Sequence, residues 1–102
     1  MQIKIYVVTT KLNSENSKLI KPQNTLIKLF SGLTETKNLK GFWINGDKVD
    51  KDRVIIWEIL TTTKDFNKNK KEFLKAINDI KEVTKQKSQL YTINKSVKPI
   101  FV

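Results

Sequence analysis

The chain contains no cysteine and no histidine. These absences exclude a disulfide framework, a cysteine nucleophile, a Ser-His-Asp site and a zinc site built from the usual ligands. The three glycines are scattered, so the chain has no phosphate-binding glycine loop. We therefore expect no enzyme, no metal site and no cofactor.

Long hydrophobic runs are also missing. No apolar stretch approaches the roughly 20 residues of a transmembrane helix, and the first residues lack the apolar core of a signal peptide. Hydrophobic residues nevertheless make up 38% of the 102 residues, enough for one small core. We expect a single domain over residues 1–102, soluble and cytoplasmic (in the host cytoplasm if the source is viral).

The charge is strongly one-sided. Lys and Arg number 20 against 10 Asp and Glu, giving a formal net charge of +10, and Arg53 is the only arginine. Such an excess favours an anionic partner. An alternative stays open: lysine and asparagine are favoured by AT-rich coding, so many of the lysines are equally consistent with a plain solvated surface.

The hydrophobic pattern predicts an α+β domain. Residues 3–9 alternate as a strand, with Ile3, Ile5 and Val7 on one face. Pro22 suits the first turn of a helix, which we expect Gly32 to cap. Asn45-Gly46 marks a turn, followed by a long loop or by a short strand piece at 48–49. The remaining predictions are strands over 39–45, 53–62 and 88–94, a helix over 68–86 capped by Asn67 or Asn69, and a candidate edge strand within 97–102.

This β-α-β-β-α-β order is the ferredoxin-like arrangement, an antiparallel sheet with two helices on one face. The strand over 53–62 is apolar on both faces, with Trp57 on one and Ile56 and Leu60 on the other. Helices cover only one face of such a sheet. We therefore expect a homo-oligomer that covers the second face. The alternative is cover by a loop or by the C-terminal tail.

Few residues are candidates for chemistry. Asp47, Asp50 and Asp52 do not match the EF-hand spacing, and interleaved cations neutralise them. Glu58 lies within an apolar strand without a histidine partner, so it is a weak catalytic candidate.

The tryptophans and two of the cations are better candidates for binding. A Trp beside a cation in a cleft can stack on a base while the cation holds a phosphate. The candidate ligand-binding residues are Lys11, Trp43, Arg53 and Trp57.

Four short segments carry a resemblance: Phe30-Ser-Gly-Leu-Thr34, Gly41-Phe-Trp43, Asp52-Arg-Val-Ile-Ile56 and Gln89-Leu-Tyr91. Over residues 26–94 this order resembles a group of small uncharacterised bacterial and phage proteins with a Phe-x-Gly-Leu-Thr and Gly-x-Trp pattern. The element order also resembles the ferredoxin-like trimers of nitrogen-regulatory signal transducers and copper-tolerance proteins, which implies ligand binding between subunits. The metal ligands of copper tolerance are absent here.

Together these observations predict a non-enzymatic oligomer that binds a small anionic, nucleotide-type ligand. Its sharpest form is a phage anti-defence sponge, to which the chain is similar in size, charge and expected oligomerisation. The alternative is a basic inhibitor or adaptor that binds nucleic acid or an acidic or nucleic-acid-handling protein. In that case the lysines of the last helix would form the binding surface.

Overall fold

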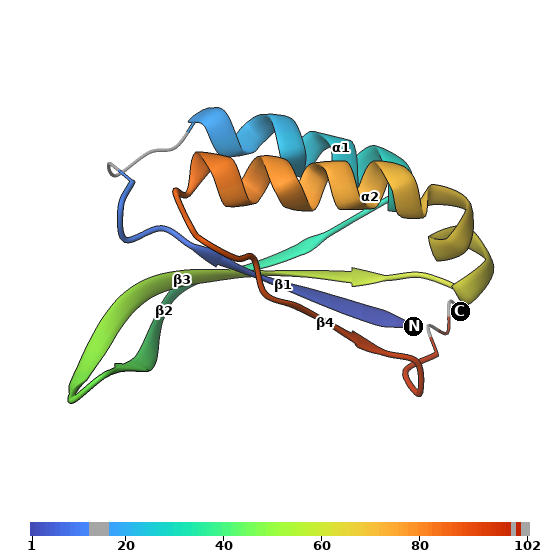
Figure 1. The fold of residues 1–102 in the computed structure, drawn as a ribbon. Coiled ribbons are helices and arrows are strands. Elements are labelled where there is room, and N and C mark those ends of the chain that lie inside the picture. Colours follow the sequence, from blue (N-terminus) through green and yellow to red (C-terminus); the bar gives the residue numbers. More distant parts are fainter. Residues whose placement is uncertain (13–16, 99, 101–102) are drawn as a thin grey trace.

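The computed structural model describes residues 1–12, 17–98 and 100. In this part of the chain, two helices cover one face of a four-stranded sheet (Figure 1). The strand order is β2-β3-β1-β4, and each neighbouring pair is antiparallel. This confirms the predicted ferredoxin-like α+β fold. The elements are β1 (Gln2–Val8), a 3₁₀ turn η1 (Ser17–Leu19), α1 (Ile20–Phe30), β2 (Thr34–Asn45), β3 (Lys48–Leu60), α2 (Thr63–Val83) and β4 (Tyr91–Asn94).

The core lies between the helices and the two central strands. Ile3, Ile5 and Val7 of β1 are fully buried, as their alternation predicts. On β3, Trp57 and Ile59 pair with Ile5 and Ile3 and are buried on the same face. This layer of branched and aromatic side chains supplies the hydrophobic stabilisation of the domain.

Aromatic rings join the helices to the sheet. Phe73 of α2 makes edge-to-face contacts with Phe30 of α1, Phe66 of α2 and Tyr91 of β4, with ring centroids 6.1, 5.3 and 5.2 Å away. One ring therefore links three elements that are distant in sequence.

The helix ends differ from the prediction. Thr62 caps α2, because its side-chain oxygen accepts a hydrogen bond from the amide of Asp65 at 3.1 Å. The helix thus begins five residues before the predicted start, and Asn67 and Asn69 lie inside it. At the end of α1, Ser31 adopts the left-handed conformation (φ 64°) and Gly32 does not, so the predicted glycine cap is wrong.

The hairpin between β2 and β3 is longer than predicted. β2 begins at Thr34, and β3 already begins at Lys48. The predicted long loop is therefore wrong, and its alternative, a strand piece at 48–49, is confirmed as the start of β3. Only Gly46 and Asp47 join the strands, and Gly46 has the positive φ (63°) that a type II′ turn needs at its first central position. The hydrophobic pattern missed residues 34–38 and 50–52 of this ribbon because all of them are polar or charged.

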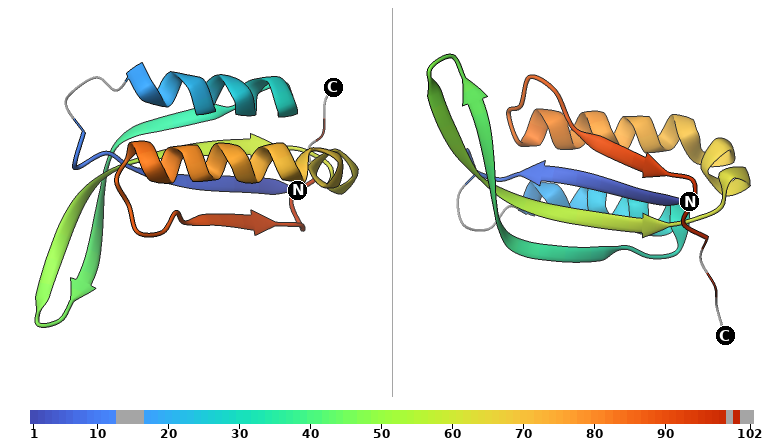
Figure 2. Two further views of the ribbon diagram at one scale, coloured as in Figure 1. Left: turned by 45° about the horizontal axis from the view of Figure 1, so that its top comes forward. Right: turned by 90° about the horizontal axis from the view of Figure 1, so that it is seen from below.

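The far half of this hairpin, residues 39–53, is here called the arm. Thirteen strand residues extend about 43 Å, whereas the 11 residues of α1 rise about 16 Å and the 21 residues of α2 about 32 Å. The arm consequently projects beyond the helical layer (Figures 1 and 2). The longest dimension of the molecule is 45 Å.

The predicted C-terminal edge strand falls partly outside the described residues. Val97, Lys98 and Ile100 are not in a strand, and residues 99, 101 and 102 lie outside the described part.

Candidate functional site

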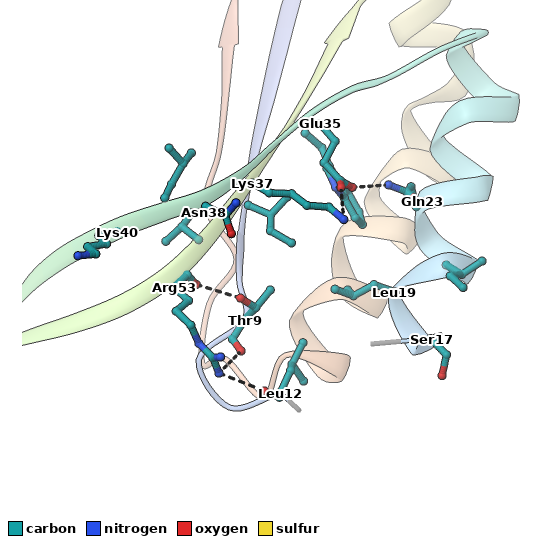
Figure 3. Close-up of a pocket in the computed structure, with 15 residues that line it drawn as sticks. Thr9, Leu12, Ser17, Leu19, Gln23, Glu35, Lys37, Asn38, Lys40 and Arg53 are labelled. Carbon is teal, nitrogen blue, oxygen red and sulfur yellow. Dashed lines mark hydrogen bonds and ion pairs between the residues drawn. The ribbon is translucent and has the colours of Figure 1, made fainter. Parts of the chain in front are cut away.

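A cleft opens where the arm leaves the body of the domain (Figure 3). Its volume is about 780 Å³. The loop after β1, the start of α1 and the middle of the β2–β3 ribbon surround it. The lining residues are Thr9, Leu12, Ser17, Leu19, Ile20, Gln23, Glu35, Lys37, Asn38, Leu39, Lys40, Arg53, Val54, Ile55 and Trp57.

A β-bulge shapes the outer wall of this cleft. The register shifts between Thr36 and Leu39, so that Lys37 and Asn38 together oppose Ile55. Asn38 adopts a left-handed conformation (φ 62°), which asparagine tolerates better than most residues. The extra residue bends β2 at the root of the arm and brings four consecutive residues, 37–40, to the cleft.

The floor of the cleft consists of side chains that are hydrogen-bonded to Glu35. Its Oε2 accepts hydrogen bonds from Nε1 of Trp57 at 2.9 Å and from Nε2 of Gln23 at 2.7 Å. Its Oε1 lies 3.2 Å from Nζ of Lys37. Trp57 stands opposite Glu35 in the strand register, so the β2–β3 pairing itself sets this geometry.

The Glu35 carboxyl is held in its charged form. Burial alone raises the pKa of Glu35, but the three donors and the ammonium charge of Lys37 outweigh burial and hold that pKa below its usual value. The carboxylate is thus a structural acceptor at neutral pH, and its charge is compensated locally.

Arg53 fixes the loop on the opposite side of the cleft. Its Nη2 donates to the backbone oxygens of Thr9, Thr10 and Leu12 at 3.3, 3.0 and 3.1 Å. Within the described part of the chain, its Nη1 and Nε donors have no hydrogen-bond partner. An arginine presents five N–H donors in one plane, so three of them stay available to an anion that enters the cleft.

The lining has both charged and apolar character. Three cations (Lys37, Lys40 and Arg53) stand against one carboxylate (Glu35), a local excess of two positive charges. Leucine, isoleucine and valine side chains make up much of the remaining wall. Eight of the 15 lining residues are polar or charged, so the wall is mixed, and its volume is in the range of small-molecule sites.

The structure brings together two of the four predicted site residues. Arg53 and Trp57 both line the cleft, but Trp57 is only 1% exposed and supports the floor through its indole N–H. Lys11 is exposed outside the cleft, and its Nζ donates to the backbone oxygen of Lys85 at 3.3 Å.

Trp43 lies on the arm and does not line the cleft. A Cβ atom at Gly41 would lie 3.1 Å from Nε1 of Trp43 and 3.1 Å from Cγ2 of Val54. The indole therefore packs over the bare backbone of Gly41, which explains the glycine in the Gly-x-Trp pattern.

Sequence reasoning missed Glu35, Gln23 and Lys37. Glu35 and Lys37 are two residues apart in a strand, so they share one face and form an ion pair. That spacing was a usable signal, but the predicted strand began only at residue 39, downstream of both residues. Gln23 could not be linked to them, because the contact joins a helix to a strand.

The other acidic residues form no metal site in the described part of the chain, which holds no group of three or more potential ligands. Asp50 accepts a hydrogen bond from Nδ2 of Asn45, and Asp52 accepts one from Oγ1 of Thr10. Glu58 stands opposite Lys4 on the sheet face away from the helices.

No described helix is both long and apolar enough to cross a membrane. Comparison with protein-family models and with curated proteins finds no match to this chain. The cleft geometry is therefore the evidence from which a function is inferred.

Proposed function

We propose that the chain is a non-enzymatic, homo-oligomeric protein that binds a small anionic ligand of nucleotide type in the cleft beside Arg53. The observation that carries this proposal is the set of unpaired Arg53 donors in a cleft whose lining has two excess positive charges. A guanidinium at a partly enclosed wall attracts a phosphate more strongly than an open surface lysine does. The apolar wall offers contact to a base or to another flat group.

The phosphate end of such a ligand would lie near Arg53 and Lys40. Lys37 is already paired with Glu35 (Figure 3), which also accepts a hydrogen bond from the buried Trp57. In a narrower form of the proposal, a phage protein sequesters a nucleotide immune signal in this cleft.

The test is isothermal titration of the protein with inorganic phosphate and a panel of linear and cyclic nucleotides. Arg53→Met removes the proposed donor. Lys71→Met, on the exposed surface of α2, removes one positive charge away from the cleft and serves as the matched control. We expect Arg53→Met to weaken binding at least about tenfold and Lys71→Met to change it less than about twofold. Equal loss in both variants, or no binding to any member of the panel, contradicts the proposal.

One observation favours a second function, binding of nucleic acid or of an acidic protein. Five lysines of α2 are exposed and have no ion pair in the described part of the chain: Lys64, Lys68, Lys70, Lys71 and Lys75. A polyanion on this surface would release many counterions, so its affinity would fall steeply with salt. A single-stranded oligonucleotide that binds with such a slope, and more weakly to Lys71→Met, would support this function instead.

A further inference from the structure

The arm exposes four large apolar side chains, more than any other pair of neighbouring strands among the described residues. Ile44 is 85% exposed, Val49 68%, Phe42 63% and Trp43 43%. Phe42 and Ile44 share one face with Val49, because Ile44 pairs with Val49 and strand faces alternate. The helices stop short of this region, so no described element covers either face of it (Figure 2). A contiguous apolar surface of this kind marks an interaction site.

The arm also presents a free sheet edge. β2 pairs only with β3 and is the outermost strand on its side. From Leu39 to Asn45 its pairing with β3 is continuous, so its outer backbone donors and acceptors run unbroken over seven residues. This stretch has no proline and no bulge, and Lys40 is its only charged residue. Natural proteins normally protect such an edge, and an unprotected one pairs readily with another strand.

The charge of the arm favours a second copy of this chain as the occupant. Residues 39–53 contain four cations and three anions, a net charge of +1, although the whole chain carries +10. Two copies that met through most other surfaces would bring large positive charges together, whereas two arms are almost neutral and do not repel. A strongly acidic partner would gain little electrostatic attraction from this near-neutral surface.

We propose that two copies pair their β2 edges antiparallel over residues 39–45, about a two-fold axis, to form one continuous sheet. In such a pairing identical strands are self-complementary, and its centre is Phe42, which faces its own counterpart. Ile44 of each copy then lies opposite Lys40 of the other on the same face, and Trp43 lies opposite Gly41 on the other face. This inference rests on the homo-oligomer part of the proposed function and names its surface. Residues 37–40 line the cleft and adjoin this edge, so the second copy would lie next to the ligand.

The oligomeric state tests this pairing. Phe42→Asp places two carboxylates opposite each other at the two-fold axis of the proposed interface, and the 63% exposure of Phe42 means that the fold itself tolerates the change. Leu74→Asp makes the same kind of change at an exposed position on α2 and is the matched control. In sedimentation velocity over a dilution series, we expect a dimer for the wild type and for Leu74→Asp. For Phe42→Asp we expect a dissociation constant raised at least about tenfold. A monomeric wild type, an odd-numbered oligomer, or equal behaviour of the two variants overturns the proposal.

Amide hydrogen exchange locates the interface. We expect slower exchange at residues 39–45 in the wild type than in Phe42→Asp at the same protein concentration. A dimer whose protected amides lie elsewhere overturns the edge pairing. Failure of this proposal is distinct from failure of the ligand proposal, because Arg53→Met reports on the cleft and Phe42→Asp reports on the edge.

Discussion

The two halves of β3 have similar strand geometry but opposite surroundings. Around Trp57 and Ile59 the strand lies beneath the helices, and these side chains form the centre of the core. Between Lys48 and Arg53 the strand runs beyond the helices and exposes side chains on both faces. The difference arises from length, since β3 extends about 43 Å, whereas α1 rises about 16 Å and α2 about 32 Å. Strand alternation alone therefore does not identify the core; the extent of the covering layer decides it.

The cleft lies at the boundary between these halves. The bulge at Lys37 and Asn38 bends β2 there, while Arg53 ties the ribbon to the loop after β1. The covered half and the projecting arm thus meet at Arg53, whose Nη1 and Nε donors have no partner among the described residues. The following predictions separate the two halves, beginning with the largest expected effect.

Trp57→Ala should destabilise the domain by about 3–5 kcal/mol, because it opens a cavity in the covered half and leaves Glu35 without its indole donor. Urea denaturation followed by circular dichroism measures the change. A loss below about 1 kcal/mol would mean that the covered half is not the folding core.

Glu35→Gln should lower the free energy of unfolding at pH 7 by about 1 kcal/mol, since it removes a charge-assisted hydrogen-bond network that is partly exposed. The folded-state pKa of Glu35 lies below its unfolded value, so its contribution is present above about pH 4.5 and is lost as the pH falls through the folded-state pKa. Urea midpoints of the wild type and the variant should therefore differ at pH 7 and converge as the pH falls through the folded-state pKa of Glu35. A difference that stays constant with pH would contradict the charged role of Glu35.

Gly41→Ala should lower the free energy of unfolding by about 1 kcal/mol, because the added methyl group would press on Val54 and Trp43 at the root of the arm. Gly32→Ala is the matched control: a Cβ atom added there would meet nothing within 4 Å and the φ of Gly32 is not positive, so we expect no loss. Thermal melting of both variants makes the comparison. Equal effects would show that Trp43 does not pack over Gly41.

Ile44→Asp should leave the stability of the isolated chain within about 0.5 kcal/mol of wild type, because the side chain is exposed on the arm. Denaturation at a concentration low enough to dissociate any oligomer measures this smallest effect. A loss comparable with that of Trp57→Ala would remove the contrast between arm and body.

The order of the elements was predictable because the buried half of each one carries a clear pattern. Ile3, Ile5 and Val7 alternate, and Phe73, Ile77 and Ile80 follow a helical stripe, so local sequence is sufficient there. In the arm, the strand over 39–45 and the turn at Asn45-Gly46 were predicted, but the continuation of β3 through residues 50–52 was not. Asp50, Lys51 and Asp52 pair through the backbone and bury no face that would produce a hydrophobic signal.

The candidate site was predictable only in part. Arg53 stood out as the single arginine, and its position in the cleft follows from the strand that carries it. The floor of the cleft depends on the hydrogen bonds that Gln23 of α1 and Trp57 of β3 donate to Glu35. The bulge that places Lys37 at the cleft depends on the register of the β2–β3 pairing. Such long-range contacts leave no mark in local periodicity.

Chemical-shift mapping of the ¹⁵N-labelled protein during titration with the nucleotide panel tests the central claim most directly. The account predicts that the largest saturable shifts fall at residues 37–40 and 53–55 around the cleft, and that Arg53→Met abolishes them. Shifts centred on the lysines of α2, or no saturable shift with any member of the panel, would contradict it.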